Sequence, residues 1–109
     1  MDQAQFEALP LHDATLSCLE LLWEQGICRA YLRLWSKELG EVVSAVLEFQ
    51  GVTGIEAPRK YEWGPSSSIL KAKRSNEVYS IQMQSGDLIS ISAQGFKLEP
   101  ANKSFKADA

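Results

Sequence analysis

The sequence predicts an all-β fold of mainly antiparallel strands, arranged as a six- to seven-stranded sandwich or a partly open barrel built from hairpins. Two stretches, 15–35 and 78–98, follow one plan: apolar and polar residues alternate, pass through a short turn that ends in glycine, and alternate again. Such alternation is typical of a half-buried strand. A short loop that ends in glycine is typical of a β-hairpin, because glycine adopts a positive φ without steric cost.

The size and composition of the chain predict one soluble domain. Its 109 residues are enough for one hydrophobic core, so we expect a single β domain over residues 1–99 and a flexible tail over 100–109. Hydrophobic residues make up 45% and charged residues 23%, as in ordinary globular proteins. No apolar run is as long as a membrane span, and the first residues do not resemble a secretion signal. We therefore expect a cytoplasmic protein that does not associate with membranes.

The first predicted elements are a short helix and a hairpin. Residues 2–8 can form one or two helical turns, which Pro10 limits because proline disfavours helix at the residue before it. Strands are predicted at 15–23 and 27–35, with Glu24-Gln25-Gly26 as a three-residue loop between them.

The register of this hairpin has two consequences. It places Cys18 and Cys28 on the order of 13 Å apart, beyond the roughly 7 Å that a disulfide spans, so we expect two free thiols. It also places Glu20 on the apolar face opposite Ala30, where a buried carboxylate would mark a functional site. A shift of one residue would instead put Glu20 opposite Arg29 as a cross-strand ion pair, and both alternatives stay open.

The rest of the chain continues the antiparallel pattern. A strand is predicted at 41–50, followed by a short strand that ends before the next proline. Another strand is predicted at 67–74. The last hairpin turns at Gln84-Ser85-Gly86, which places Ile81 opposite Ile89.

The best candidate binding residues lie in the aperiodic segment 59–68. Arg59, Tyr61, Glu62 and Trp63 form the densest aromatic and charged cluster of the chain. Tryptophan, tyrosine and arginine are the residues that most often anchor protein interfaces, and loops held by a rigid sheet are common places for recognition. The structural alternative is that Trp63 closes one open end of the sandwich.

His12 and Asp13, which precede the first long strand, form a second candidate binding site. Adjacent side chains of an extended chain point in opposite directions, so Asp13 is not by position the orienting partner of His12. The two residues fasten the chain to nearby backbone groups, or they contribute to binding at one rim of the sheet. We predict no catalytic residues, since no nucleophile motif is present. We also predict no metal site and no cofactor, since neither ligand spacing nor a phosphate-binding glycine loop occurs.

The charge distribution argues against nucleic acid as a partner. The net charge is −3, and most acidic residues lie in the first half of the chain. Five basic residues gather in the middle: Arg59, Lys60, Lys71, Lys73 and Arg74. Lysines that alternate along a strand usually mark its solvent face, and an acidic protein without a large basic patch is a poor non-specific binder of nucleic acid.

One succession of motifs resembles a known group of proteins. Leu11-His12-Asp13-Ala14-Thr15-Leu16, then an alternating hairpin, then Leu47-Glu48-Phe49-Gln50-Gly51-Val52 followed by Ile55, is similar to small bacterial all-β domains of unknown or immunity-type function. Trp63-Gly64-Pro65-Ser66 extends the likeness. The resemblance implies a cytoplasmic bacterial protein that binds and neutralises a partner such as a toxin, and it implies no catalytic residues.

Together these observations predict a non-catalytic protein-interaction domain of immunity type rather than an enzyme. Two alternatives remain. One is a small-ligand-binding β barrel or sandwich with a polar ligand head near Glu20 or His12, and the other is a hydrolase or isomerase that uses His12. Strands with apolar residues on both faces are also compatible with a homodimer.

Overall fold

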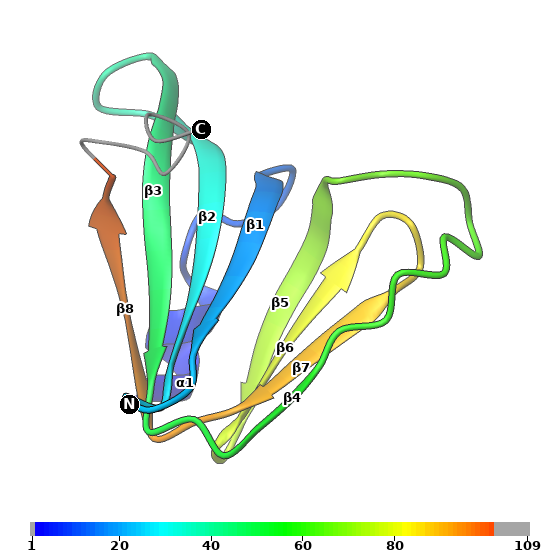
Figure 1. Ribbon diagram of the computed structural model, residues 1–109. Helices are drawn as coiled ribbons and strands as arrows, with labels where there is room; N and C mark the ends of the chain where they lie inside the picture. The colour runs from blue at the N-terminus through cyan, green and yellow to red at the C-terminus, as the bar shows by residue number, and fades with distance from the viewer. Residues whose placement is uncertain (1, 102–109) are drawn as a thin grey trace.

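The computed structural model describes the backbone of residues 2–101 and the side chains of residues 5–101. In this part of the chain, eight strands form two four-stranded antiparallel sheets, one more strand than the upper limit predicted (Figure 1). The first sheet has the order β1-β2-β3-β8 and contains β1 (Thr15–Leu22), β2 (Ile27–Ser36), β3 (Glu41–Gln50) and β8 (Gly95–Pro100). The second has the order β4-β7-β6-β5 and contains β4 (Gly54–Glu56), β5 (Ile69–Ser75), β6 (Val78–Met83) and β7 (Leu88–Ser92). The predicted all-β class is confirmed, and the open sheets form a sandwich rather than a closed barrel.

The two sheets converge at one end of the molecule and diverge at the other (Figure 1). At the convergent end β3 leads into β4 and β7 leads into β8, and the backbone N–H of Gln94 donates to the carbonyl of Gln50 at 2.8 Å. Toward the divergent end a bridge between Thr15 and Ser68 joins β1 to the start of β5. Three backbone hydrogen bonds of 2.8–2.9 Å join the two segments here: Asp13 N–H to the carbonyl of Ile69, Ile69 N–H to the carbonyl of Ala14, and Leu16 N–H to the carbonyl of Ser67.

The first hairpin has a different register from the one predicted. Leu22 pairs with Ile27, so the loop has four residues and includes Trp23. The N–H of Gly26 donates to the carbonyl of Leu22 at 3.0 Å, which closes this longer loop. The preferred register is therefore wrong by one residue, and the alternative that places Glu20 opposite Arg29 is the one observed.

A β-bulge in β1 changes which side chains of this strand point toward the core. Between Leu16 and Cys18 the register shifts by one, so that Leu16 and Leu19 both pack against the core. The cysteines are both free, as predicted: Cys18 is half-buried and Cys28 is buried.

The last hairpin has the predicted loop and register. Ile81 pairs with Ile89, and the N–H of Met83 donates to the carbonyl of Asp87 at 2.8 Å across the loop Gln84-Ser85-Gly86. Gly86 has φ 93°, in the left-handed region that favours glycine. This hairpin is the scaffold of the candidate site.

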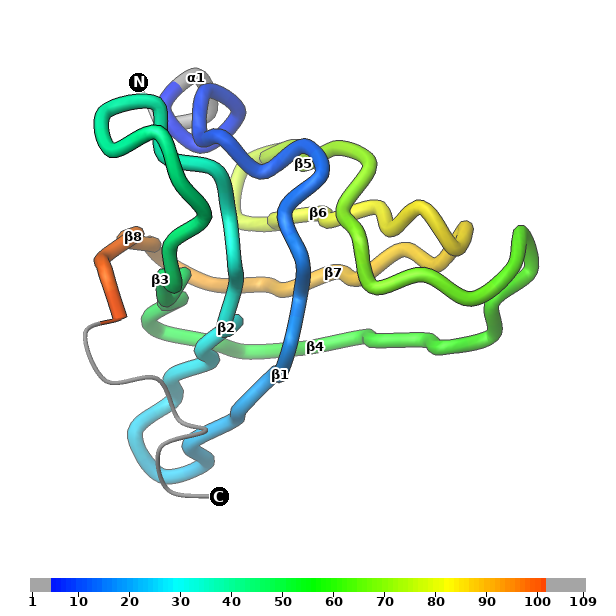
Figure 2. Tube along the Cα trace, turned by 90° about the horizontal axis from the view of Figure 1, so that it is seen from above, coloured from blue at the N-terminus to red at the C-terminus, as the bar shows by residue number. Residues whose placement is uncertain are grey.

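The helix α1 (Asp2–Glu7) closes one side of the sandwich (Figure 2). It packs against β5, and Phe6 is completely buried among the rings of Phe49, Tyr79 and Phe96, with centroid distances of 6.2, 4.9 and 5.2 Å. Trp63, by contrast, is 63% exposed, which contradicts the structural alternative that it closes an open end of the sandwich. No described helix is long and apolar enough to cross a membrane. Of the predicted tail, Pro100 is the last residue of β8, and positions 102–109 lie outside the described residues.

Candidate functional site

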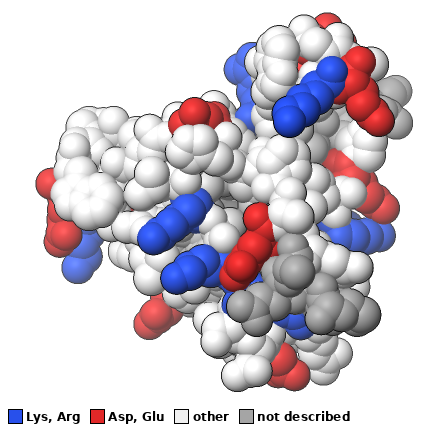
Figure 3. Space-filling model, turned by 180° about the vertical axis from the view of Figure 1, so that it is seen from behind, with Lys and Arg blue, Asp and Glu red and all other residues white. Residues whose placement is uncertain are grey.

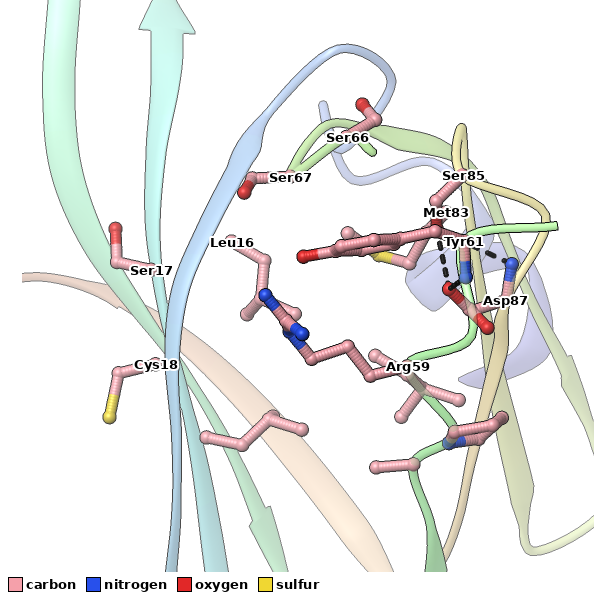
Figure 4. A pocket seen from close by; sticks show the side chains of 14 residues that line it. Leu16, Ser17, Cys18, Arg59, Tyr61, Ser66, Ser67, Met83, Ser85 and Asp87 are labelled. Carbon is pink, nitrogen blue, oxygen red and sulfur yellow. Dashed lines mark hydrogen bonds between the residues drawn. The ribbon is translucent and has the colours of Figure 1, made fainter. Parts of the chain in front are cut away.

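A buried aspartate holds the loop that carries the predicted binding residues. The loop runs from Arg59 to Trp63 beside the β6–β7 hairpin, and Asp87, the residue before β7, is only 6% exposed. Its carboxylate accepts hydrogen bonds from the backbone N–H groups of Lys60 and Tyr61, at 2.7 and 3.1 Å, and from the hydroxyl of Ser85 at 2.7 Å (Figure 4). These bonds join two segments that are far apart in the sequence.

The electrostatics of Asp87 follow from the same bonds. The backbone N–H of Lys60, and then the hydroxyl of Ser85, hold the pKa of the Asp87 carboxyl below its usual value, because each donor stabilises the charged form. Asp87 is thus an ionised anchor whose hydrogen-bonding capacity is largely used by the protein itself. The loop is also fixed by the N–H of Trp63, which donates to the carbonyl of Ser85 at 2.9 Å.

The anchored loop divides the predicted cluster into an outer and an inner part. Trp63 and Glu62 are exposed on the outer side. The Trp63 ring lies against Gly86 so closely that a Cβ at Gly86 would be 2.8 Å from the ring atom Cδ2. Arg59 and Tyr61 lie on the inner side, where the guanidinium carbon of Arg59 is 4.5 Å from the centre of the Tyr61 ring.

The inner side faces a cavity of about 360 Å³ between β1 and the loop (Figure 4). The Arg59 side chain extends into it toward Leu16, beneath the ring of Tyr61. Ser17 and Cys18 of β1 point away from it. Its apolar wall consists of Leu16, Leu19, Ala57, Pro58, Met83 and Ile89.

The predicted pair His12 and Asp13 lies elsewhere, at the start of β1. Nδ1 of His12 is 2.7 Å from the carbonyl oxygen of Leu70, which requires the proton on that nitrogen. The carboxylate of Asp13 accepts a hydrogen bond from Nε2 of Gln84 at 2.6 Å. The two side chains also approach each other, with Nε2 of His12 3.5 Å from Oδ2 of Asp13, because Asp13 has φ 68° and the chain is not extended there as expected. Both are about two-thirds exposed. These contacts fasten β1 to the second sheet, and neither residue lines the cavity beside Arg59.

Glu20 is not the buried carboxylate that the preferred register predicted. It lies half-exposed on the outer face of the first sheet, where the Tyr31 hydroxyl donates to it at 2.9 Å and Arg29 is 3.6 Å away. Arg29 also donates from Nε to Glu48 at 3.0 Å. The pKa of Glu48 is lowered, first by a hydrogen bond from Gln50 and then by Arg29. Glu20 therefore belongs to a polar network on the sheet surface.

The face opposite to that of Figure 1 carries charges of both signs (Figure 3). Figure 3 shows lysine and arginine side chains interspersed with aspartate and glutamate on that face. Lys71 and Lys73 of β5 are exposed, as predicted for the solvent side of a strand.

Sequence reasoning missed Asp87, the residue that organises the site. A signal was present: the register predicted for the last hairpin puts Asp87 opposite Met83, on the same face as Ile81 and Ile89, where an acidic residue needs hydrogen-bond partners. Within residues 5–101, no three histidine, cysteine or acidic side chains are grouped to hold a metal ion. Comparison of the chain with family models, curated proteins and solved structures found no match.

Proposed function

We propose that this chain is a non-catalytic domain that binds another protein through a surface centred on Trp63. The observation that supports the proposal is a large exposed aromatic side chain on an ordered loop: Trp63 is 63% exposed, while its backbone and ring are held by Ser85 and Gly86. Tryptophan is enriched among the residues that dominate binding energy at protein interfaces. A loop that is ordered before binding loses less conformational entropy when the complex forms.

The residues beside Trp63 fit the edge of such an interface. Lys60 and Glu62 are exposed and carry opposite charges. A polar rim around an aromatic centre is the usual composition of a protein interface. Exposed charges of this kind influence the association rate and the choice of partner more than the affinity.

A more specific version of the proposal is an immunity-type role in the bacterial cytoplasm. In this role the domain inhibits its partner protein by covering the partner's functional surface. The support for this form is the sequence resemblance of residues 11–56. No chemical step is required of the domain, because occupation of the partner's surface is enough to stop the partner's activity.

The test compares two variants that each remove one exposed tryptophan. Trp63→Ala removes the proposed anchor, and Trp35→Ala removes a 57% exposed tryptophan from β2 as the matched control. Tagged wild-type and variant proteins are used to capture partners from an extract of the source cells. We expect a partner that wild type and Trp35→Ala retain and Trp63→Ala loses, with unchanged thermal unfolding in all three.

Two outcomes contradict the proposal. One is a folded Trp63→Ala protein that retains the partner with wild-type affinity, and the other is a partner that Trp35→Ala loses equally. For the immunity-type form, the captured partner's activity is measured with and without the domain. If the partner is equally active in the complex, the immunity-type form is excluded, but the proposal that Trp63 binds the partner is not contradicted.

A further inference from the structure

The cavity beside Arg59 differs from two other hollows of the described surface in the charged group that extends into it. The hollow near the β1–β2 loop is lined by Trp23, Val52, Ile55 and neighbours and contains no charged side chain. The groove between α1 and the β2–β3 turn has charged residues of both signs. The cavity between β1 and the loop has an apolar wall and one charge of each sign, but the Asp87 carboxylate is hydrogen-bonded within the protein, whereas the Arg59 guanidinium extends into the cavity (Figure 4).

We propose that this cavity binds a small carboxylic acid with an apolar body, in which the carboxylate pairs with Arg59 and the body lies against Leu16 and Met83. The planar guanidinium matches a carboxylate with two parallel hydrogen bonds. Contact with the Tyr61 ring orients this group from one face. Among the residues that the structure describes, no carboxylate forms an ion pair with Arg59.

Asp87 also lines the cavity, and its hydrogen bonds explain why the site selects an anion. Its carboxylate already accepts from Lys60, Tyr61 and Ser85. It therefore presents little free acceptor capacity to an amine or other cation. The charged group that can bind a ligand in this cavity is the donor, Arg59.

The size and walls of the cavity define the ligand further. A volume of about 360 Å³ lies at the small end of the usual range for ligand sites, roughly 300–1,000 Å³. The wall provides aliphatic carbons and the thioether of Met83, and Tyr61 provides an aromatic face. Ser66 and Ser67 lie at its upper side (Figure 4). This composition fits a monocarboxylate with a phenyl-sized or branched aliphatic body.

The probes are 3-phenylpropionate and 4-methylpentanoate, each compared with its uncharged amide, which has nearly the same shape. Binding is measured by titration in two-dimensional amide NMR spectra. We expect at least one acid to shift the amide signals of Leu16, Tyr61 and Asp87. We expect the matching amide to bind about tenfold to hundredfold more weakly, because it lacks the charge-assisted hydrogen bonds.

Two variants test whether the binding of the acid depends on the charge of Arg59. Arg59→Gln removes the charge from an exposed position. It is expected to weaken binding of the acid about tenfold to hundredfold, as replacement of the acid by its amide does. Arg33→Gln, on the exposed part of β2, is the control that changes the net charge equally and is expected to bind like wild type. Equal affinities of Arg59→Gln and wild type, equal affinities of acid and amide, or no binding of either acid at millimolar concentration would overturn the proposal.

This site is independent of the proposed protein-binding surface. Trp63 does not line the cavity, so Trp63→Ala is expected to bind the acid like wild type. Arg59→Gln is expected to retain the protein partner. If Arg59→Gln loses the protein partner and the free acids do not bind, the guanidinium serves the protein interface and the small-acid site is excluded.

Discussion

The carboxylate of Asp87 accepts the backbone N–H of Lys60 at 2.7 Å, although 27 positions separate the two residues in the sequence. This bond ties the loop before β5 to the hairpin between β6 and β7. It determines where Arg59 and Trp63 lie, one on the inner and one on the outer side of the loop. Both proposed binding functions depend on this anchor.

Asp87→Asn is expected to loosen the Arg59–Trp63 loop. An amide has one acceptor oxygen where the carboxylate has two, and its NH₂ group would face a backbone donor. We expect a lower midpoint of thermal unfolding and faster hydrogen exchange at the amides of Lys60, Tyr61 and Trp63. Glu56→Gln, an exposed carboxylate on β4, is the control and should change neither measurement. Unchanged exchange in Asp87→Asn would show that the anchor does not order the loop.

The same anchor predicts how stability depends on acidity. The folded-state pKa of Asp87 is lowered, so its contribution to stability is complete above the unfolded-state pKa of about 3.9 and is lost as the pH falls through the folded value. Thermal midpoints of wild type and Asp87→Asn are measured from about pH 6 to pH 2. We expect the difference between them to shrink below about pH 4. A difference that is constant over this range would contradict the assignment of an ionised Asp87.

Gly86→Ala is expected to displace Trp63. The added Cβ would lie 2.8 Å from Cδ2 of the ring, at a residue whose φ is 93°. Backbone strain and the clash together are expected to lower the free energy of unfolding by about 2–4 kcal/mol, measured by urea denaturation. Loss of partner binding should accompany this change.

Gly40→Ala is the matched control for that variant. Gly40 has φ 66°, but no atom lies within 4 Å of an added Cβ. It should therefore show the backbone strain alone, about 1–2 kcal/mol, with partner binding unchanged. An equal loss of stability in both variants would mean that Trp63 moves aside without cost.

The two hairpins show what the sequence could and could not predict. Both loops end in glycine, and the register predicted for Ile81 and Ile89 is the one observed. The register predicted for the first hairpin was wrong because its loop has four residues instead of three. The bulge after Leu16 brings both Leu16 and Leu19 to the core, and local periodicity does not distinguish such a bulge from a different loop length. The same one-residue error explains why Glu20 was predicted on the apolar face, whereas in the structure it lies on the polar face opposite Arg29.

The candidate site was predictable in its residue types and not in its arrangement. The composition of the 59–68 segment identified Arg59, Tyr61 and Trp63. Their division between two sides of the loop depends on hydrogen bonds to Asp87, which lies in another hairpin. Such long-range bonds leave no periodic pattern in the sequence.

The two cysteines are expected to react at very different rates. Burial, and then the charge of Glu20, raise the pKa of Cys28 to about 11, so only about one thiol in a thousand is ionised at pH 8. Cys18 is half-buried and pairs with Tyr31, on the opposite face of the sheet from Cys28. With an aromatic disulfide reagent, we expect one fast and one slow thiol in the native protein and two fast thiols in denaturant. Cys18→Ser should remove the fast phase and Cys28→Ser should leave it, whereas the reverse would contradict the observed register.

Phe6→Ala is expected to release α1 from the sandwich. A six-residue helix is not stable by itself, so its position depends on Phe6, which is fully buried against Phe49, Tyr79 and Phe96. Truncation of a buried phenylalanine costs about 3–5 kcal/mol, which urea denaturation can measure. Hydrogen exchange should also increase at Arg74, whose backbone N–H donates to Glu7 at 3.1 Å. Gln5→Ala, at the exposed neighbouring position, should change stability by less than about 0.5 kcal/mol. A similarly small effect of Phe6→Ala would mean that the two sheets retain their packing without the helix.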